Sequence, residues 1–313
     1  MSHYFLFLDI LLLVLAVCSA LCNGFILGVI ATHAALRKND ALYLIVALCI
    51  ADFLLATTLI PYIVLLLSGW RENTAEIDYP SLTILILNLP VVLEIKVNNI
   101  LTVAIAVDRV YAVYWPIAYK VRRKSLYILG SILIGCSWAT FDGTFLMTST
   151  NFTSHPGCAA AGCFTDRPFR NYRGTSDMCI NLVAMITTTI LLLKLRQLSS
   201  AVRSATESRR TIVVADGERN KFRHANRIVA SILIISGICI LLPSVFSGLG
   251  EIFQLPAFQK AGPFVAVGLL LSGTLNAIVY GLNHSDVRQV IRGLRRKTSG
   301  LRLIPASFTP SRT

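Results

Sequence analysis

Two charged residues, Asp108 and Arg109, end a long apolar run that begins near Leu82. A carboxylate beside a guanidinium can form a charge-assisted ion pair that holds the arginine in one place. Pro116 follows shortly afterwards and stops or kinks a helix, because proline lacks a backbone N–H. Charged residues at the end of an apolar run are typical of a helix that leaves a membrane. The pair is therefore a candidate switch at a membrane surface.

Polar side chains also interrupt the apolar runs themselves: Asn23, Asp52, Glu94, Lys96, Asn98, Asn276 and Tyr280. A charged group in hydrocarbon is costly, so it needs a partner or a function. Glu94 and Lys96, two residues apart on a helix, point in different directions. Either Lys96 faces a pocket and pairs with an acidic ligand, or both residues only satisfy neighbouring helices. Asn23, Asp52 and Asn276 likewise either join helices by hydrogen bonds or form part of a switch.

Catalytic and metal chemistry find no support in the sequence. The five histidines are scattered over loops and helix ends, so no cluster of nucleophile, base or metal ligands is visible. We therefore expect neither an enzyme nor a metal site. Most cysteines lie in apolar runs, where cysteine acts as a small hydrophobic residue. Cys158 and Cys163 lie in a polar loop and are the candidate disulfide pair.

The composition indicates a membrane protein. Hydrophobic residues make up 55% of the chain and charged residues 14%, whereas a soluble domain has about 25% charged residues. The net charge of +13 could suggest nucleic acid, but the basic residues lie in loops between apolar runs. We therefore expect no nucleic-acid partner. Basic loops beside a membrane instead favour contact with anionic lipids.

Seven apolar runs approach or exceed the length that spans a bilayer, which is about 20 residues. They cover residues 5–30, 42–67, 82–107, 126–147, 178–195, 228–249 and 263–282. The predicted fold class is an all-α seven-transmembrane helix bundle that forms one domain, residues 1–298. A stretch at 285–297, with apolar residues between arginines, is predicted to be a short amphipathic helix after the seventh span. Residues 299–313 are expected to be a disordered cytoplasmic tail.

The distribution of basic residues predicts the orientation. Most of the 29 Lys and Arg residues follow the first, third, fifth and seventh runs. The positive-inside rule then places the N-terminus outside the cell and the C-terminus in the cytoplasm, in the plasma membrane. The first run is expected to be an uncleaved helix, with cleavage after Ala20 as the alternative. The sequon at Asn151 falls in the second outer loop, where it is a candidate glycosylation site.

The order of these features resembles that of rhodopsin-like G protein-coupled receptors. Members of that family carry an Asn in helix one, an Ala-Asp step in helix two, Asp-Arg-Tyr at the end of helix three and a Trp in helix four. They also carry a Pro in helix six and Asn-Pro-x-x-Tyr in helix seven. The matching residues here are Asn23, Asp52, Asp108, Arg109, Trp138, Pro243, Asn276 and Tyr280. The resemblance covers most of the chain, from Asn23 to about Leu294.

The chain departs from the family pattern at several positions. Val110 replaces the aromatic residue after Arg109, Leu241 replaces a Trp and Ala277 replaces a Pro. Ile84 lies near the place of the usual helix-three cysteine, and helix five contains no proline. Cys158 and Cys163 are then left to pair with each other. This pattern is similar to that of the nematode serpentine chemoreceptors.

The resemblance implies a chemosensory receptor that binds an extracellular small molecule or short peptide and activates a heterotrimeric G protein. It assigns the activation switch to Asp108, Arg109, Pro116, Asn276 and Tyr280. It assigns a polar core, with a sodium ion or water near Asp52, to Asn23, Asp52, Glu94 and Asn98. The candidate ligand-pocket residues are Val91, Val92, Ile95, Lys96, Leu241 and Leu270.

Two further features limit the ligand and the class of protein. Val91 and Val92 stand where the family's amine receptors need an Asp, and the seventh run contains no Lys. Amine ligands and opsin chemistry are therefore not expected. The alternatives to a coupled receptor are a non-coupling seven-helix relative and a membrane transporter or channel. A transporter would show internal repeats or broken helix pairs, and the sequence shows neither.

Overall fold

The computed structural model describes residues 2–37, 42–73, 76–153, 156–158, 160–208, 231–253, 264–283 and 287–288. Within these ranges seven helices are long and apolar enough to cross a membrane, and no strand is formed. The seven-helix fold class is therefore confirmed. The spanning helices are α1 (Ser2–Thr32), α3 (Tyr43–Ser68), α4 (Ser81–Tyr114), α6 (Lys124–Ser149), α7 (Arg167–Ser208), the segment Ser231–Gly250 and α11 (Phe264–Asn283).

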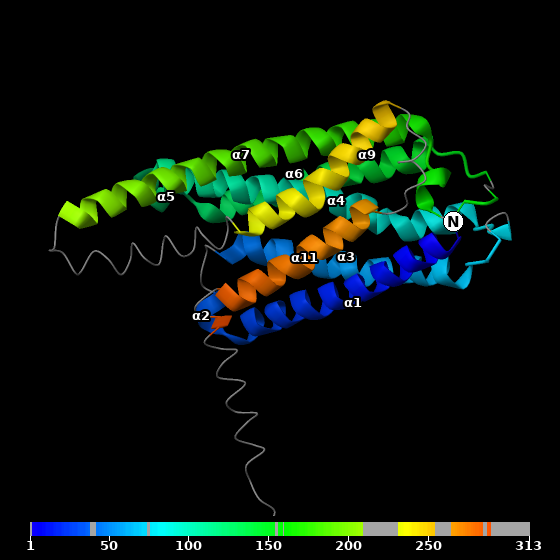
Figure 1. The fold of residues 1–313 in the computed structure, drawn as a ribbon, viewed down its shortest axis with the longest axis horizontal. Helices are drawn as coiled ribbons and strands as arrows, with labels where there is room; N and C mark the ends of the chain where they lie inside the picture. Colours follow the sequence, from blue (N-terminus) through cyan, green and yellow to red (C-terminus); the bar gives the residue numbers. More distant parts are fainter. Residues whose placement is uncertain are drawn as a thin grey trace, which may run out of the picture.

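The helices run along one long axis, and short elements lie at its two ends (Figure 1). The 3-10 turn η3 (Ala161–Phe164) belongs to a loop closed by the Cys158–Cys163 disulfide. We call this end of the bundle the disulfide end. The short helices α2 (Ala34–Arg37) and α5 (Pro116–Val121) lie at the opposite end, which we call the Arg109 end. The chain enters at the disulfide end, and α11 ends at the Arg109 end, as an odd number of spans requires.

The sixth spanning segment is not a uniform α-helix. A π-helical turn, η4 (Gly237–Leu241), leads into α9 (Leu242–Ile252). Pro243 lacks an N–H, so it cannot serve as the usual hydrogen-bond donor to the Cys239 carbonyl one turn earlier. Gly268 of α11 packs against that carbonyl, and a Cβ at this position would overlap the oxygen. The predicted helix-six proline thus creates a bulge that a glycine of α11 accommodates.

Two apolar clusters fill the bundle, and buried polar side chains lie between them. On α4, Asn98 lies between Ile95 of the cluster at the disulfide end and Leu101 of the cluster at the Arg109 end. On α3, Asp52 lies in the same position between the two clusters. We call these side chains the polar layer, which consists of Ser19, Asn23, Asp52, Glu94, Lys96, Asn98, Asn99, Ser236, Ser272 and Asn276.

The fifth spanning helix begins earlier than the predicted run 178–195, because α7 covers Arg167–Ser208. The prediction that its first turns belong to the outer loop is wrong. Phe169 and Tyr172 pack against Phe145 of α6, with ring centroids 5.6 and 5.4 Å apart. Hydropathy missed these turns because their sequence is polar, although packing against α6 holds them in the bundle.

The predicted amphipathic helix at 285–297 lies outside the described residues, except for positions 287 and 288. Val287 is fully buried in the apolar cluster at the Arg109 end. The predicted tail, residues 299–313, also lies outside the described residues.

Candidate functional site

The polar layer brings Asp52 of α3 and Asn98 of α4 into direct contact. The Asn98 amide donates a hydrogen bond of 2.9 Å to Asp52 Oδ1, and both side chains are buried. Gly273 of α11 lies against the same carboxyl group, since a Cβ on Gly273 would be 2.8 Å from Asp52 Cγ. The absence of a side chain at Gly273 therefore lets α11 approach the carboxylate.

Two asparagines connect α11 to its neighbours at this depth. The Asn23 amide of α1 donates to the Ser19 carbonyl at 3.0 Å and to the Gly273 carbonyl at 3.4 Å. The Asn276 amide donates to Ser236 Oγ and Ser272 Oγ, both at 3.3 Å. The structure thus brings together α1, α3, α4, α11 and the sixth spanning segment at the depth of the predicted polar core.

Several acceptor oxygens in this layer have no hydrogen-bond partner among the described residues. They are Asn23 Oδ1, Asp52 Oδ2, Glu94 Oε1, Asn99 Oδ1 and Asn276 Oδ1, and the Asn99 amide nitrogen also lacks a partner. A buried polar atom without a partner costs about 1–3 kcal/mol. Oxygen ligands suit hard cations, whereas the Asn99 amide nitrogen is a donor and suits a water molecule. The chemistry of the layer therefore fits a small cation or water molecules near Asp52.

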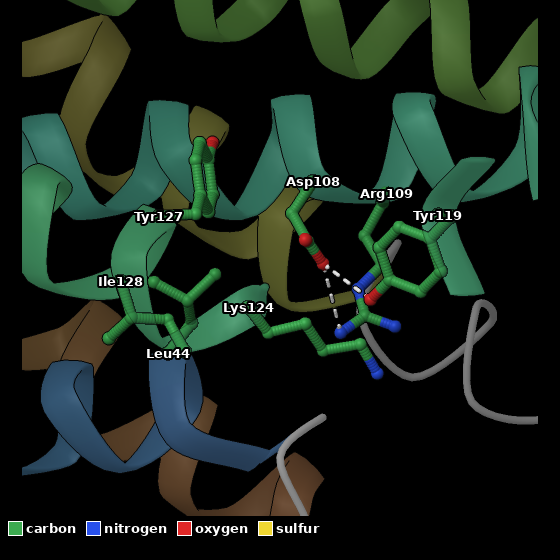
Figure 2. A pocket seen from close by; sticks show the side chains of 7 residues that line it. All are labelled: Leu44, Asp108, Arg109, Tyr119, Lys124, Tyr127 and Ile128. Atoms are coloured by element: carbon green, nitrogen blue, oxygen red, sulfur yellow. Dashed lines mark hydrogen bonds and ion pairs between the residues drawn. The ribbon is translucent and has the colours of Figure 1, made fainter. Parts of the chain in front are cut away.

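The ion pair at the end of α4 is buried and is supported by a tyrosine (Figure 2). Arg109 Nη2 lies 3.4 Å from Asp108 Oδ2, and the Tyr119 hydroxyl donates to the same oxygen at 3.1 Å. Asp108 is 5% exposed and Arg109 is 7% exposed, so water screens the pair little. Lys124 and Tyr127 line the same small pocket.

Pro116 and Tyr119 explain how α5 reaches this pair. Pro116 begins α5, as suits a residue whose N–H would be unsatisfied in the first turn. Tyr119 follows almost one helical turn later and reaches back to Asp108. Burial raises the pKa of Tyr119, while the nearby Arg109 charge opposes this shift. The phenol therefore remains a hydrogen-bond donor at neutral pH. Sequence reasoning missed Tyr119, although its spacing from Pro116 could have indicated it.

Lys96 lies in a network of opposite charges and aromatic rings. Its Nζ is 2.6 Å from Asp177 Oδ1 of α7 and 3.4 Å from Asp142 Oδ2 of α6. The Tyr172 hydroxyl donates to Asp142 Oδ1 at 2.7 Å, and Trp138 Nε1 donates to that hydroxyl at 2.8 Å. We call these residues the Lys96 cluster. It ties three helices together around a lysine that is 0% exposed.

This arrangement favours the alternative in which Lys96 satisfies neighbouring helices. Asp142 and Asp177 were not selected from the sequence, and both occupy the positions that an acidic ligand would need. Asp142 is a charged residue inside the fourth predicted run, and this was the signal that could have found it, whereas Asp177 lies just before the fifth predicted run. The other candidate pocket residues Val91, Val92, Ile95 and Leu270 are buried in the apolar cluster at the disulfide end. The side chain of Leu241 lies outside the described residues.

The loop at the disulfide end folds onto the bundle. Its Ala161 N–H donates to the Tyr62 hydroxyl at 3.3 Å, and the Gly157 N–H donates to the Ile77 carbonyl at 2.8 Å. Tyr79 supports the fold of this region, because its hydroxyl donates to the Leu66 carbonyl at 2.8 Å. Burial raises the pKa of Tyr79 to about 12. The candidate glycosylation residue Asn151, in contrast, is exposed.

Seven apolar helices with a buried polar layer and an ion pair at the end of the third span define a multi-pass membrane protein of the seven-helix class. The family model described as "Serpentine type 7TM GPCR chemoreceptor Srbc" matches residues 1–281. The chain therefore belongs to this chemoreceptor family, and the resemblance inferred from the sequence is confirmed. No match is found among curated proteins.

Proposed function

We propose that the chain is a plasma-membrane chemosensory receptor that converts binding of an extracellular ligand into activation of a heterotrimeric G protein. One observation carries the proposal: α4 holds Arg109 against Asp108 and Tyr119 at one end of the bundle. The same helix supplies Glu94 and Asn98 to the polar layer. A shift of α4 would therefore affect both regions.

The geometry of the ion pair suits a switch. Arg109 lies 3.4 Å from Asp108 Oδ2, and Tyr119 donates to the same carboxylate oxygen. A movement of α4 relative to α5 would separate Tyr119 from Asp108, so the carboxylate could turn and its contact with Arg109 could be exchanged for one between Arg109 and a partner protein. A ligand activates the receptor to the extent that it binds the released state more tightly. Asn276 and Tyr280 on α11 would transmit the same movement from the polar layer.

The disulfide end is the proposed extracellular side. A disulfide persists in an oxidising compartment, and Cys158 and Cys163 both lie at this end. The exposed Asn151 on the same loop is the proposed glycosylation site. A small molecule or short peptide would bind where this loop covers the bundle. A ligand screen would identify it.

The polar layer is the proposed site of a sodium ion. Asp52 and Glu94 would hold the ion with oxygen atoms of Asn23 and Asn276, because these atoms otherwise lack partners among the described residues. The ion would supply positive charge that stabilises the buried carboxylates. Its removal would change the balance between the resting and the released state.

The test of the function is nucleotide exchange on a panel of G proteins in cells that express the intact chain or the Arg109→Ala variant. We expect basal or ligand-evoked exchange that falls to the level of cells without receptor in this variant. An N-terminal tag, stained on intact cells, matches the surface levels. The tag also tests the orientation, because staining requires an extracellular N-terminus.

Arg71→Ala is the control, because Arg71 is an exposed arginine at the disulfide end, away from the proposed switch. This control should keep full exchange. Normal exchange in Arg109→Ala would contradict the proposed switch. Silence of the intact chain on every G protein, despite surface staining, would instead favour a non-coupling relative, and ion flux would then test the channel alternative.

A further inference from the structure

The segment from α5 to the start of α6 carries a dense set of positive charges at the Arg109 end (Figure 1). The basic residues are Lys120, Arg122, Arg123 and Lys124, and no acidic residue lies among them. We call residues 115–126 the α5 surface. Lys124 also lines the pocket of the Asp108–Arg109 pair, whereas the proposed G protein switch does not use the other three side chains.

Aromatic rings hold two of these cations in place. The Arg122 guanidinium carbon lies 3.9 Å from the ring centroid of Tyr127 and 5.2 Å from that of Tyr111. Lys124 Nζ lies 4.9 Å from the ring centroid of Tyr119. Cation–π contacts orient a cation but do not neutralise its charge. In the described part of the chain no carboxylate forms an ion pair with either cation, so both charges remain available to an anion.

The α5 surface also exposes large apolar side chains. Ile117 is 82% exposed and Val121 is 81% exposed, and both lie on the same face of α5 because they are four residues apart. Trp115 is 56% exposed beside them. Exposure of such side chains to water is unfavourable, whereas the boundary between headgroups and acyl chains accommodates them.

The position of the surface agrees with that boundary. The spanning helix α6 begins at Lys124, and Leu126 in its first turn is already 62% exposed, as expected for a side chain that faces lipid. Tyrosine and tryptophan concentrate at the same depth in membrane proteins. Tyr111, Tyr114 and Trp115 surround the surface, with ring centroids of Tyr111 and Trp115 5.6 Å apart. The basic side chains therefore lie at the level of lipid headgroups.

We propose that the α5 surface binds the phosphate headgroup of an anionic membrane lipid. Arg122 and Arg123 can meet phosphate oxygens with paired N–H donors, and Lys124 adds a point charge. Ile117 and Val121 insert into the adjoining acyl region. A headgroup with several phosphates engages more of these cations, so a phosphatidylinositol bisphosphate binds more tightly than phosphatidylserine. The inference goes beyond the proposed function and needs no G protein.

The experiment uses the full chain in a neutral detergent, titrated with phosphatidylinositol bisphosphate, and native mass spectrometry counts the bound lipid. In the triple variant Arg122→Gln, Arg123→Gln, Lys124→Gln the apparent affinity falls at least about ten-fold. The matched control replaces three exposed arginines outside the surface: Arg37→Gln, Arg71→Gln and Arg196→Gln. It should retain the affinity within about two-fold, because it loses the same charge elsewhere.

A second variant tests the apolar half of the surface. Ile117→Ser with Val121→Ser should weaken binding of the lipid but not binding of soluble inositol trisphosphate. If the control arginine variant lost as much affinity for the lipid as the triple variant, net charge alone would explain the effect, and the proposal would be overturned. Inositol trisphosphate that binds the intact chain as tightly as the lipid would also overturn it. The proposal would also be overturned if the serine variant bound the lipid with unchanged affinity and changed only nucleotide exchange, because the α5 surface would then bind a protein.

Discussion

Lys96 and Asn98 are two residues apart on α4, yet they face polar environments of opposite kinds. Lys96 meets Asp177 at 2.6 Å and Asp142 at 3.4 Å, so its charge is compensated on two sides. Asn98 meets Asp52, and within the described residues no cation forms an ion pair with that carboxylate. On the Lys96 side, Asp142 Oδ2 accepts no hydrogen bond but has the lysine charge 3.4 Å away. On the other side, Asp52 Oδ2 has neither a hydrogen bond nor an ion pair among the described residues.

This difference separates a structural role from a functional one. A buried ion pair with further hydrogen bonds fixes the relative position of the helices that share it. The Lys96 cluster therefore sets how α4, α6 and α7 pack near the disulfide end. A layer with unpaired oxygens can gain or lose an ion or water with little repacking. The Asp52 face is therefore the side of α4 on which we propose that an ion binds.

The largest expected effect comes from breaking the Lys96 cluster. Among the described residues, Lys96→Met leaves Asp142 buried without its cation and leaves Asp177 with only Arg173, 3.8 Å away. Loss of one partner of a buried pair costs about 3–5 kcal/mol. We expect a large drop in surface expression and in the thermal unfolding temperature of the purified protein in detergent. This loss would follow from packing, not from ligand recognition.

The triple variant Lys96→Met, Asp142→Asn, Asp177→Asn provides the control. It removes the charges together, so it should regain most of the stability lost in Lys96→Met, because no buried charge is left unpaired. A Lys96→Met variant that folds normally but loses its response to acidic ligands would contradict this view. Lys96 would then be a ligand-binding residue, as the other interpretation of the sequence holds.

Much of the fold and part of the polar core could be predicted from the sequence. The spans, the polar residues within them and the family were predicted, because hydrophobic length and charge placement are properties of the sequence alone. The contact of Asp52 with Asn98 agrees with the predicted polar core, since the resemblance to rhodopsin-like receptors implied that the face of Asn98 looks toward Asp52. Asp108 and Arg109 are adjacent in sequence, so their pairing needed no tertiary information.

The partners of Lys96 could not be predicted in this way. Asp142 and Asp177 come from helices far apart in the sequence, and only the packing of α6 and α7 against α4 brings them to one lysine. Because the first turns of α7 are polar, Asp177 was assigned to a predicted loop. The contact of Tyr119 with Asp108 was not predicted either, because it depends on the path of α5.

A smaller effect should follow from pushing α11 away from the polar layer. Gly273→Ala places a methyl group 2.8 Å from Asp52 Cγ, and such overpacking typically costs about 1–3 kcal/mol. Gly28→Ala is the matched control, since a Cβ at Gly28 meets nothing within 4 Å. The control should leave the unfolding temperature unchanged or raise it slightly, because alanine favours a helix over glycine. Equal unfolding temperatures for the two variants would show that α11 does not press on Asp52.

The smallest effect tests whether the unpaired oxygens hold sodium. The intact protein should unfold at a higher temperature in sodium chloride than in choline chloride of equal concentration. A tenfold excess of sodium over its Kd stabilises by about 1.4 kcal/mol. Asp52→Asn should abolish this difference between the two salts. Asp177→Asn should lower the unfolding temperature in both salts but keep the difference between them, because Asp177 belongs to the Lys96 cluster. Asp177→Asn could instead remove the sodium effect as completely as Asp52→Asn. The two faces of α4 would then not be independent, and the distinction between a structural face and an ion-binding face would be wrong.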